Sequence, residues 1–427
     1  MTKLPRKFIL PMTMMFGLFF MISFVTGLQN PMGVIVRNQF GISNFMSQLG
    51  NAANFIAYLC MGVPTGLLLS KIGYKRTALT AIVVGTVGVI ISYLSGIVGS
   101  FAVYLIGAFI SGFSMCMLNS TVNPMVNTMA GGGSKGNQFL QLGGTLNSLG
   151  ATIVPILVGS FIGDATRATI SDATPALITA LVIFVAAFIV LFFMHIPEPH
   201  MAKSEEIESN AYADSRKSPL QFRHFVFGAI AIFFYVGVEV SIPNIANLYM
   251  TSDVELGGLD IDAGLAGNIV GIYWFLMLIG RFIGAAISSK ISTRKMLASV
   301  NIAAMALVLL AIFLPNPMVD VPLFEDDFKI GMAQVPLNIL MLTLCGLCTS
   351  VMWGNIFNLA VEGLGKHTAA ASGIFMTMVC GGGILPLVQG FVADQVGYTS
   401  SYFVTIIGLA VMLWYAVRGS KFRSKTA

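Results

Sequence analysis

Long apolar stretches separated by short polar segments recur along the entire chain. Most contain about 18–25 residues, which is enough for an α-helix to cross a hydrocarbon core about 30 Å thick. The pattern predicts twelve spanning helices, at 9–36, 45–70, 77–97, 101–126, 138–162, 173–195, 224–249, 264–289, 296–314, 334–361, 368–391 and 399–418. The predicted fold class is therefore an all-α polytopic membrane protein.

Composition agrees with this class and excludes a soluble domain. Hydrophobic residues make up 56% of the 427-residue chain and charged residues only 10%, whereas a soluble domain has about 25% charged residues. The first apolar stretch, 9–36, is too long for the core of a signal peptide and lacks a clear small-residue cleavage site. We interpret it as a retained helix.

The basic residues predict the orientation of the chain in the membrane. Nineteen of the 23 Lys and Arg residues fall on one side of the twelve-span arrangement: Lys3, Arg6, Lys7, Lys71, Lys75, Arg76, Lys135, Lys203, Arg216, Lys217, Arg223, Lys290, Arg294, Lys295, Lys366, Arg418, Lys421, Arg423 and Lys425. By the positive-inside rule, both termini are cytoplasmic and the location is the plasma (cytoplasmic or inner) membrane. The net charge of +5 is thus explained by the basic residues on the cytoplasmic side of the membrane, and no nucleic-acid partner is indicated.

The longest polar stretch divides the chain into two halves. We interpret 196–223 as a cytoplasmic linker between an N-terminal six-helix half, 1–195, and a C-terminal six-helix half, 224–427. An acidic insertion near 315–333 lies in the loop before the tenth span.

Two junctions repeat between these halves. Counting from Gly66 and from Ala285, basic residues fall at the same positions, +5, +9 and +10: Lys71, Lys75 and Arg76 in the first half, and Lys290, Arg294 and Lys295 in the second. Two parallel six-helix repeats with a cavity at the membrane midplane are the architecture of a large class of transporters.

Short motifs in these junctions and spans resemble those of a known family. The stretch "GLLLSKIGYKR", 66–76, resembles the loop motif of the major facilitator superfamily, with Ser70 where that motif has an aspartate. The motifs "NPM", "NSLGA", "FFYVG", "GRFIGA" and "GGGILPLVQGFVAD", in this order, are similar to those of its fucose and glucose/galactose permease family. The resemblance implies the major facilitator fold, and it implies a gating or structural role for Gly66, Lys71, Gly73, Lys75, Arg76 and Arg281.

The resemblance also implies a substrate and shows where this chain departs. Members of the family are sugar–proton symporters or sodium-linked hexose transporters. Their proton-coupled members carry acids where this chain has Asn30 and Asn119, and a glutamine where it has Gly144, whereas Asn147 is retained. Proton symport through the family's own acidic positions is therefore in doubt.

Two charged residues remain within predicted spans. A carboxylate at the bilayer centre costs about 2.5–3.5 kcal/mol on insertion scales, so the presence of Glu239 suggests a function. We consider it a candidate for the coupling group, or else an acceptor for substrate or a partner of an arginine. Arg281 is interpreted as a gating or structural residue that pairs with an acid or extends to the interface.

Sugar recognition needs hydrogen-bonding groups and an aromatic face. The candidate substrate-binding residues within spans are Gln29, Asn30, Asn119, Asn123, Asn147, Glu239, Asn244, Trp274, Trp353, Asn355 and Gln389. For each amide the alternative is an interhelical hydrogen bond, worth about 0.6 kcal/mol.

The sequence lacks the motifs of other functional classes. No P-loop, Ser-His-Asp arrangement or metal-ligand spacing is present. We therefore do not expect an ATP-driven pump or a membrane enzyme, and we expect neither a catalytic site nor a metal site. We expect no cofactor beyond a coupling ion, H⁺ or Na⁺, and a monomer whose partners are the lipid bilayer and a small molecule.

The resulting hypothesis is a secondary importer of a monosaccharide, such as a hexose or a fucose-like sugar, that works by alternating access. The alternatives are a facilitator without ion coupling, a transporter of an amino sugar, small anion or drug on the same fold, and a sensor that binds without transport.

Overall fold

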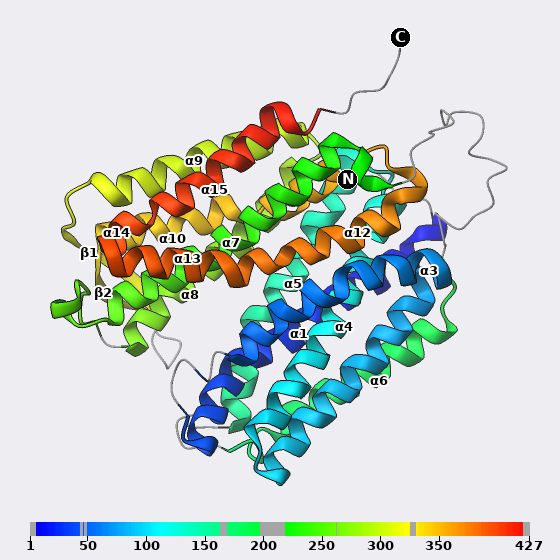
Figure 1. Ribbon diagram of the computed structural model, residues 1–427, viewed down its shortest axis with the longest axis horizontal. Coiled ribbons are helices and arrows are strands. Elements are labelled where there is room, and N and C mark those ends of the chain that lie inside the picture. Colours follow the sequence, from blue (N-terminus) through cyan, green and yellow to red (C-terminus); the bar gives the residue numbers. More distant parts are fainter. Residues whose placement is uncertain are drawn as a thin grey trace. The chain divides into compact units, whose positions relative to one another are not determined.

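The structure, a computed structural model, describes residues 6–42, 46, 49–162, 169–196, 218–261, 263–324 and 330–421. Helices account for most of them (Figure 1). The chain divides into two compact units, the first made of Met1–Val226 and Val361–Met378, the second of Phe227–Ala360 and Val379–Ala427.

The first unit contains the first six predicted spans and a segment from much later in the sequence. Its elements are α1 (Arg6–Phe40), α3 (Leu49–Val98), α4 (Phe101–Met129), α5 (Gly133–Ile162), α6 (Thr174–Phe193), the 3₁₀ turns η1 (Pro219–Gln221) and η3 (Gly365–His367), and α12 (Thr368–Thr377). The sequence assigns α12 to the C-terminal half, and the predicted boundaries of the two halves stay a prediction.

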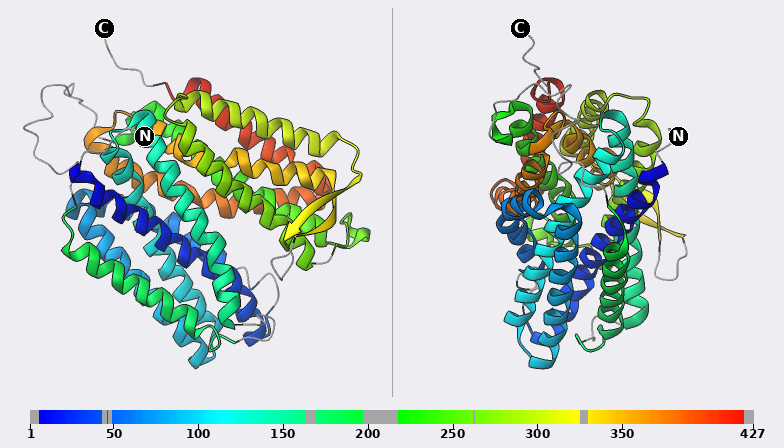
Figure 2. Two further views of the ribbon diagram at one scale, coloured as in Figure 1. Left: turned by 180° about the vertical axis from the view of Figure 1, so that it is seen from behind. Right: turned by 90° about the vertical axis from the view of Figure 1, so that its right-hand side faces the viewer.

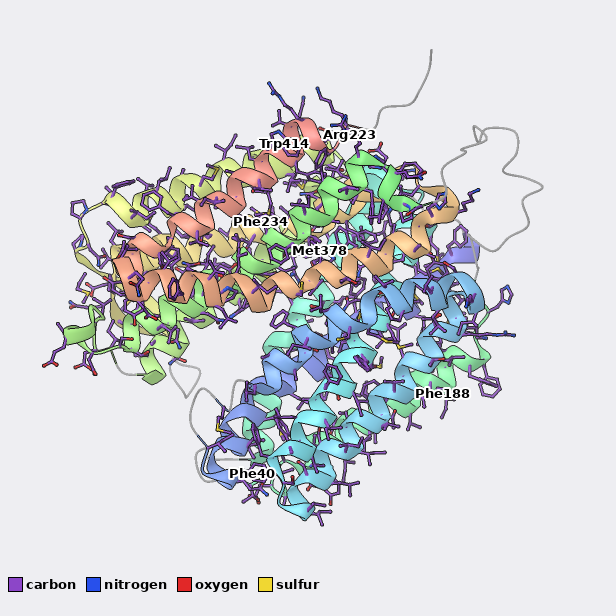
Figure 3. All side chains as sticks on the ribbon, in the orientation of Figure 1. Phe40, Phe188, Arg223, Phe234, Met378 and Trp414 are labelled. Carbon is purple, nitrogen blue, oxygen red and sulfur yellow. The ribbon has the colours of Figure 1, made fainter. Side chains whose placement is uncertain are left out.

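The second unit contains the remaining spans. Its elements are α7 (Arg223–Thr251, from Phe227), η2 (Val254–Leu256), α8 (Ala263–Ile287), α9 (Thr293–Phe313), β1 (Met318–Phe324), β2 (Ile330–Pro336), α10 (Leu337–Thr349), α11 (Met352–Ala360), η4 (Met378–Cys380, from Val379), α13 (Gly381–Val396), α14 (Tyr398–Ser401), α15 (Phe403–Trp414) and the π-helical turn η5 (Tyr415–Gly419). Figure 3 marks Trp414, whose ring packs edge-on against Phe227 with centroids 4.8 Å apart.

Each predicted span lies largely on helix, although the tenth begins on β2 and is divided between α10 and α11, and the chain is a multi-pass membrane protein. Among the described residues, ten helical stretches are long and apolar enough to cross a membrane. One of them, 52–98, covers two predicted spans, and α5 is not among the ten. The number of twelve crossings therefore remains a prediction.

The two spans within α3 meet at Gly73. This residue has φ 84° and ψ 175°, a backbone conformation that interrupts the helix and that a residue with a Cβ rarely adopts. The hydroxyl of Thr77 donates to the Gly73 carbonyl at 2.7 Å. Gly73 is thus the point at which one long helical segment becomes two.

The acidic insertion forms a β-hairpin that the sequence analysis treated only as loop. β1 and β2 are antiparallel, with Met318 opposite Pro336 and Phe324 opposite Ile330, and the hairpin is drawn in yellow in Figure 2. The alternation of apolar and polar residues in "MVDVPLF" favours a strand. This alternation is much shorter than the apolar stretches from which the spanning helices were predicted, so the sequence prediction did not include a strand here.

Small residues allow the helices of the first unit to approach closely. A Cβ on Gly88 of α3 would lie 2.7 Å from the backbone nitrogen of Ser111 of α4, and one on Gly107 of α4 would lie equally close to that of Ser92. Such contacts are how membrane helices associate when lipid tails are as apolar as the side chains.

α3 and α12 also approach each other closely. A Cβ on Gly373 would lie 2.6 Å from the nitrogen and 2.7 Å from the Cα of Gly66, and one on Gly66 would lie 3.2 Å from the carbonyl oxygen of Ala369. The Ser372 hydroxyl donates to the Ser120 carbonyl at 2.8 Å. Pro124 has no N–H and therefore leaves this carbonyl without its usual intrahelical donor.

The repeated basic residues cap equivalent helices. The Lys75 ammonium donates to the carbonyl of Phe192 near the end of α6 at 2.7 Å, and the Arg294 guanidinium donates to the carbonyl of Ser420 after η5 at 2.9 Å. Cations stabilise the C-terminal ends of helices, where carbonyls lack intrahelical donors. Lys75 and Arg294, which occupy repeated positions in the sequence, thus make the same kind of contact with a helix end.

Replacing Gly373 tests the close crossing of α3 and α12. We expect Gly373→Leu to lower the free energy of unfolding by about 1–3 kcal/mol, because its side chain would meet backbone atoms that cannot rotate away. Unfolding in mixed detergent micelles measures the change. Gly390→Leu is the matched control, since nothing lies within 4 Å of a Cβ there. Equal stability of the two variants would contradict the crossing.

Candidate functional site

A buried ion pair joins α7 to α8 in the second unit. The Nη2 atom of Arg281 lies 3.4 Å from Oε1 of Glu239, and the two side chains are only 13% and 14% exposed. The sequence analysis left this pairing open as one interpretation of each residue. Two opposite charges removed together from solvent are far less costly than either alone.

Tyr235 is a second partner of the carboxylate. It lies four residues before Glu239 on α7, so both side chains occupy the same face of the helix. The Tyr235 hydroxyl donates to Oε1 of Glu239 at 2.6 Å, and its fully buried ring lies 6.2 Å from that of Trp353. The carboxylate oxygen nearest to the arginine therefore also accepts a hydrogen bond from a fixed phenol.

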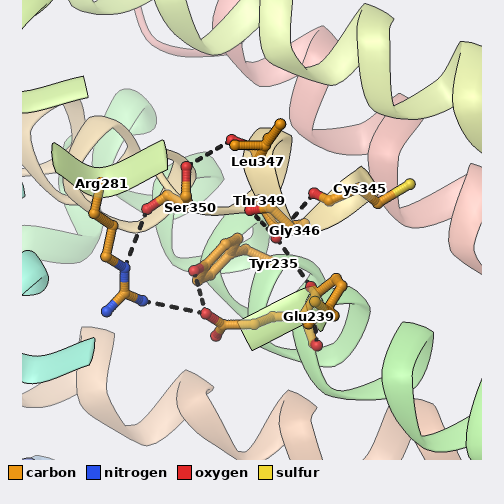
Figure 4. Close-up of polar contacts among 9 residues, drawn as sticks. Tyr235, Glu239, Arg281, Cys345, Gly346, Leu347, Thr349 and Ser350 are labelled. Atoms are coloured by element: carbon orange, nitrogen blue, oxygen red, sulfur yellow. Dashed lines mark hydrogen bonds and ion pairs between the residues drawn. The ribbon is translucent and has the colours of Figure 1, made fainter. Parts of the chain in front are cut away.

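Arg281 has a second partner at a break in the tenth predicted span. α10 ends at Thr349 and α11 begins at Met352, and the Nε atom of Arg281 donates to the carbonyl of Ser350 at 3.3 Å (Figure 4). A helix C-terminus presents carbonyls without intrahelical donors and favours a cation. One guanidinium thus joins the carboxylate of α7 to the broken helix.

Tyr273 completes the arrangement from α8. Pro243 lies inside α7 and has no N–H, so the carbonyl of Glu239 four residues earlier lacks its usual donor. The Tyr273 hydroxyl donates to this carbonyl at 3.2 Å and lies 2.9 Å from the Thr349 hydroxyl. The backbone of Glu239 is therefore held by the same two elements, α8 and the end of α10, that hold its charge.

These contacts define what the arrangement can do. The carboxylate is stable while Arg281 faces it, but a movement that separates α7 from α8 or from the α10 break would leave a buried charge uncompensated. Binding a proton or a ligand group at the carboxylate would remove that cost. The protonation or ligand state of Glu239 and the contact between α7, α8 and the α10 break are therefore energetically linked.

The predicted amides of the first unit have defined partners. The Asn119 side chain is half-buried, and its Nδ2 donates to the Tyr58 hydroxyl at 2.8 Å. Asn123 is fully buried and donates to the Asn119 carbonyl at 2.9 Å, within α4. Asn147, also half-buried, donates to the carbonyl of Phe19 on α1 at 3.1 Å. Asn119 and Asn147 thus keep exposed surface, whereas the contacts of Asn123 favour a structural role within α4 beside Pro124.

Gln29 and Asn30 lie on α1, but their side chains fall outside the described residues. Their assignment as substrate-binding amides therefore stays a prediction.

The predicted amides of the second unit do not all meet at Glu239. Asn244 is exposed and lies five residues further along α7, about 140° around the helix from Glu239. Gln389 is buried, where its Oε1 accepts from Thr405 at 3.1 Å and its Nε2 donates to Ser401 at 3.4 Å. The contacts of Gln389 favour a role in joining α13 to the last span.

The remaining predicted residues are placed as follows. Asn355 is fully buried on α11, Trp353 is half-buried at the start of the same helix, and Trp274 is 41% exposed on α8. Lys71 and Arg76 are exposed.

Sequence reasoning missed the hydroxyl groups that organise this site, Tyr235, Tyr273 and Thr349. Two signals were present. Tyr235 has the i, i+4 spacing to Glu239, and Pro243 marks a carbonyl that needs a donor from another helix. Which helix supplies that donor cannot be read from local pattern.

Comparison with known proteins gives consistent results. The family profile described as Major Facilitator Superfamily matches residues 15–385. The chain is 31% identical over 412 residues to a protein named glucose/galactose transporter from Brucella abortus biovar 1 (strain 9-941), covering 95% of this chain and 92% of that protein. It is 25% identical over 445 residues to the L-fucose-proton symporter of Escherichia coli (strain K12), covering 99% and 95% of the two chains.

Solved structures show the same fold. The crystal structure of the E. coli fucose:proton symporter matches with a TM-score of 0.79 at 23% identity, covering 98% of this chain and 100% of that one. A proton:xylose symporter bound to a bromodeoxyglucose matches with a TM-score of 0.71 at 11% identity, covering 95% and 94% of the two chains.

A double-mutant cycle tests the ion pair. Removing one member of a buried pair typically costs about 3–5 kcal/mol, because the other charge stays buried. We therefore expect Arg281→Met to be strongly destabilising and Glu239→Gln to relieve part of that loss when the two are combined. The readout is the free energy of unfolding in mixed micelles.

The control cycle pairs Glu239→Gln with Arg294→Met, whose guanidinium contacts Ser420 instead. We expect these two effects to add, as they do for distant sites. Simple additivity in the Glu239–Arg281 cycle as well would show that the pair makes no energetic contribution.

Proposed function

We propose that this chain imports a monosaccharide by alternating access. The chain belongs to the major facilitator superfamily and, within it, to the fucose and glucose/galactose permease family. It is a transporter and not an enzyme. The substrate we propose is a hexose or a fucose-like sugar, supported by relatives named glucose/galactose transporter and L-fucose-proton symporter.

The moving parts we propose are the two six-helix halves, 1–195 and 224–427, joined by the cytoplasmic linker 196–223. The clustering of Lys and Arg residues supports cytoplasmic termini in the plasma membrane. We take the functional unit to be a monomer, because a single chain of this class contains both repeats that alternating access needs.

The observation that carries the proposal is the Glu239–Arg281 pair. This chain has amides where proton-coupled relatives have acids, at Asn30 and Asn119, so the coupling role needs another carboxylate. Glu239 is only 14% exposed and is linked to two other helical segments through Arg281 and Tyr273. We propose that it binds the coupling proton when its contact with Arg281 is lost during the transport cycle.

The pair also explains how rearrangement without a bound proton would be avoided. With Arg281 in place, the carboxylate is compensated and has no need of a proton. With Arg281 withdrawn, an empty carboxylate in the apolar interior is costly, so the rearranged state forms readily only in the protonated form. Protonation and helix movement thus occur together.

The sugar-binding residues we propose in the first unit are the half-buried amides Asn119 and Asn147, together with Gln29 and Asn30. Hydroxyl-rich ligands need several such groups, because each buried hydroxyl must exchange its water partners for protein ones. Trp353 and Asn355 of α11 are the contributors from the second unit. A neutral substrate agrees with a site whose two identified charges satisfy each other.

Uptake into proteoliposomes tests the proposal. Labelled D-glucose, D-galactose and L-fucose are offered with an inward proton gradient, an inward sodium gradient, or neither. We expect accumulation above equilibrium with the proton gradient alone, and we expect Glu239→Gln to lose accumulation while still exchanging labelled for unlabelled sugar. Asp320→Asn, which removes an exposed carboxylate on β1, is the matched control and should accumulate sugar normally.

Other outcomes assign the function differently. Accumulation with sodium alone would replace the proton with Na⁺, and equilibration without accumulation would indicate a facilitator. No uptake or binding of any of the sugars would refute the substrate class and favour a different small solute.

A further inference from the structure

α9 and α15 lie side by side in the second unit (Figure 1). Both belong to helical stretches that are long and apolar enough to cross a membrane. At one end of the pair, the ring centroids of Phe313 and Phe403 are 6.1 Å apart, and at the other end the Arg294 guanidinium donates to the Ser420 carbonyl at 2.9 Å. The two helices are therefore joined at both ends and run antiparallel across the membrane.

Each of these helices exposes a stripe of side chains along its length. On α9 the stripe consists of Lys295, Ser299, Ile302, Ala306, Leu309 and Phe313. On α15 and the turn η5 it consists of Phe403, Ile407, Ala410, Trp414, Val417 and Arg418. Steps of three and four residues keep a stripe on one face of a helix. Apart from the cation at one end, the side chains of both stripes are apolar or small, as is typical of contact with lipid tails.

The cations of the two stripes lie at the same corner of the unit. Arg294 adjoins Lys295, and its partner Ser420 is two residues beyond Arg418, so the hydrogen bond between them holds the two stripes together at this corner. Arg294 is half-buried, whereas Lys295, Arg418 and Lys421 are exposed. Three exposed cations therefore gather where two lipid-facing stripes begin, at the membrane surface that the clustering of Lys and Arg assigns to the cytoplasm.

Trp414 marks the level of the lipid headgroups at this corner (Figure 3). Its side chain is 45% exposed, and its ring packs edge-on against Phe227. Tryptophan is enriched where hydrocarbon meets water. Arg418 follows it by four residues, which is close to one turn in an α-helix and in the π-helical turn η5 alike. A cation thus lies one turn beyond an indole at the membrane interface.

No described carboxylate of the second unit lies at this corner. Glu239 is paired with Arg281 inside the membrane. The other described carboxylates of the unit belong to segments at the opposite membrane surface, and they are Asp253, Glu255, Asp260, Asp320 and Asp394. The corner therefore carries a positive charge that an anionic group from the membrane can balance.

The repeated corner of the first unit provides an internal comparison. Arg76 occupies the position of Lys295 in the sequence repeat and is likewise exposed. The neighbouring helix α6 differs, because no Lys or Arg lies between Thr174 and Ile196, and its end exposes Phe192 and Phe193. Cations contributed by two adjacent helices are therefore a feature of the second unit and not a general consequence of the positive-inside rule.

We propose that this corner is a binding site for the headgroup phosphate of an anionic phospholipid, such as phosphatidylglycerol, in the cytoplasmic leaflet. Lys295 and Arg418 contact the phosphate, Lys421 adds to the positive charge, and the acyl chains lie along the stripes of α9 and α15. Arginine suits this role because its guanidinium can bind two phosphate oxygens at once. Phosphatidylcholine carries its own compensating cation and should bind less tightly.

Emission from Trp414 reports which lipid occupies the corner. The chain has three tryptophans, so Trp274→Phe combined with Trp353→Phe leaves Trp414 as the only emitter. This protein is reconstituted in phosphatidylcholine vesicles that contain a minor fraction of one lipid brominated in its tails. We expect brominated phosphatidylglycerol to quench the emission about threefold more than the same fraction of brominated phosphatidylcholine, because the cations enrich an anionic lipid at the site.

Two variants of this protein identify the residues responsible. Lys295→Gln combined with Arg418→Gln should remove the preference, so that both brominated lipids quench equally. Arg76→Gln removes a cation from the repeated corner of the first unit, and this matched control should keep the preference. Equal quenching by the two lipids before these changes, or a preference that survives Lys295→Gln with Arg418→Gln, would overturn the inference.

Thermal unfolding keeps the test valid if the tryptophan replacements impair the protein. With all three tryptophans present, phosphatidylglycerol added to the protein in neutral detergent micelles should raise the Tm more than phosphatidylcholine does. Lys295→Gln combined with Arg418→Gln should abolish this difference, and Arg76→Gln should preserve it. An equal rise with both lipids, or the same rise with inorganic phosphate, would contradict a phospholipid site.

Discussion

A membrane-spanning helix cannot leave a backbone carbonyl without a donor at low cost, and prolines inside helices, such as Pro124 and Pro243, create that need. Pro124 frees the carbonyl of Ser120, which accepts from Ser372 of α12, and Pro243 frees that of Glu239, which accepts from Tyr273 of α8. Each bond joins two helices at the point where a proline removes an intrahelical donor. The second fixes the residue whose side chain carries the buried negative charge, so the backbone constraint and the electrostatic one meet at a single residue.

Glu239 and Arg281 are stable in the interior because each has more than one partner. The carboxylate accepts from Tyr235 and faces the guanidinium, which also contacts the carbonyl end of α10. Three helical segments therefore depend on one another through one pair of charges. We propose that a change of protonation or a bound ligand at the carboxylate alters all three at once, and this is the physical basis on which we connect the site to alternating access.

Much of the fold was predictable from local pattern, because spanning helices need long apolar stretches and their flanks carry charge. The repeated basic positions predicted related junctions, and Lys75 and Arg294 make the same kind of helix cap. Glu239 and Arg281 were identifiable as rare intramembrane charges, but their pairing was only one of several readings. Tyr273, the β-hairpin and the close contact of Gly373 with Gly66 depend on which segments meet in space, and hydropathy does not encode that.

The central claim is that a proton enters with the sugar and that Glu239 receives it. The most direct measurement is the pH of a lightly buffered medium around proteoliposomes when sugar is added without any imposed gradient. We expect the medium to become alkaline as wild-type protein carries sugar and protons inward. With Glu239→Gln, we expect no such change of pH while sugar exchange continues. Sugar entry into wild-type proteoliposomes without alkalinisation, or alkalinisation that persists in Glu239→Gln, would contradict it.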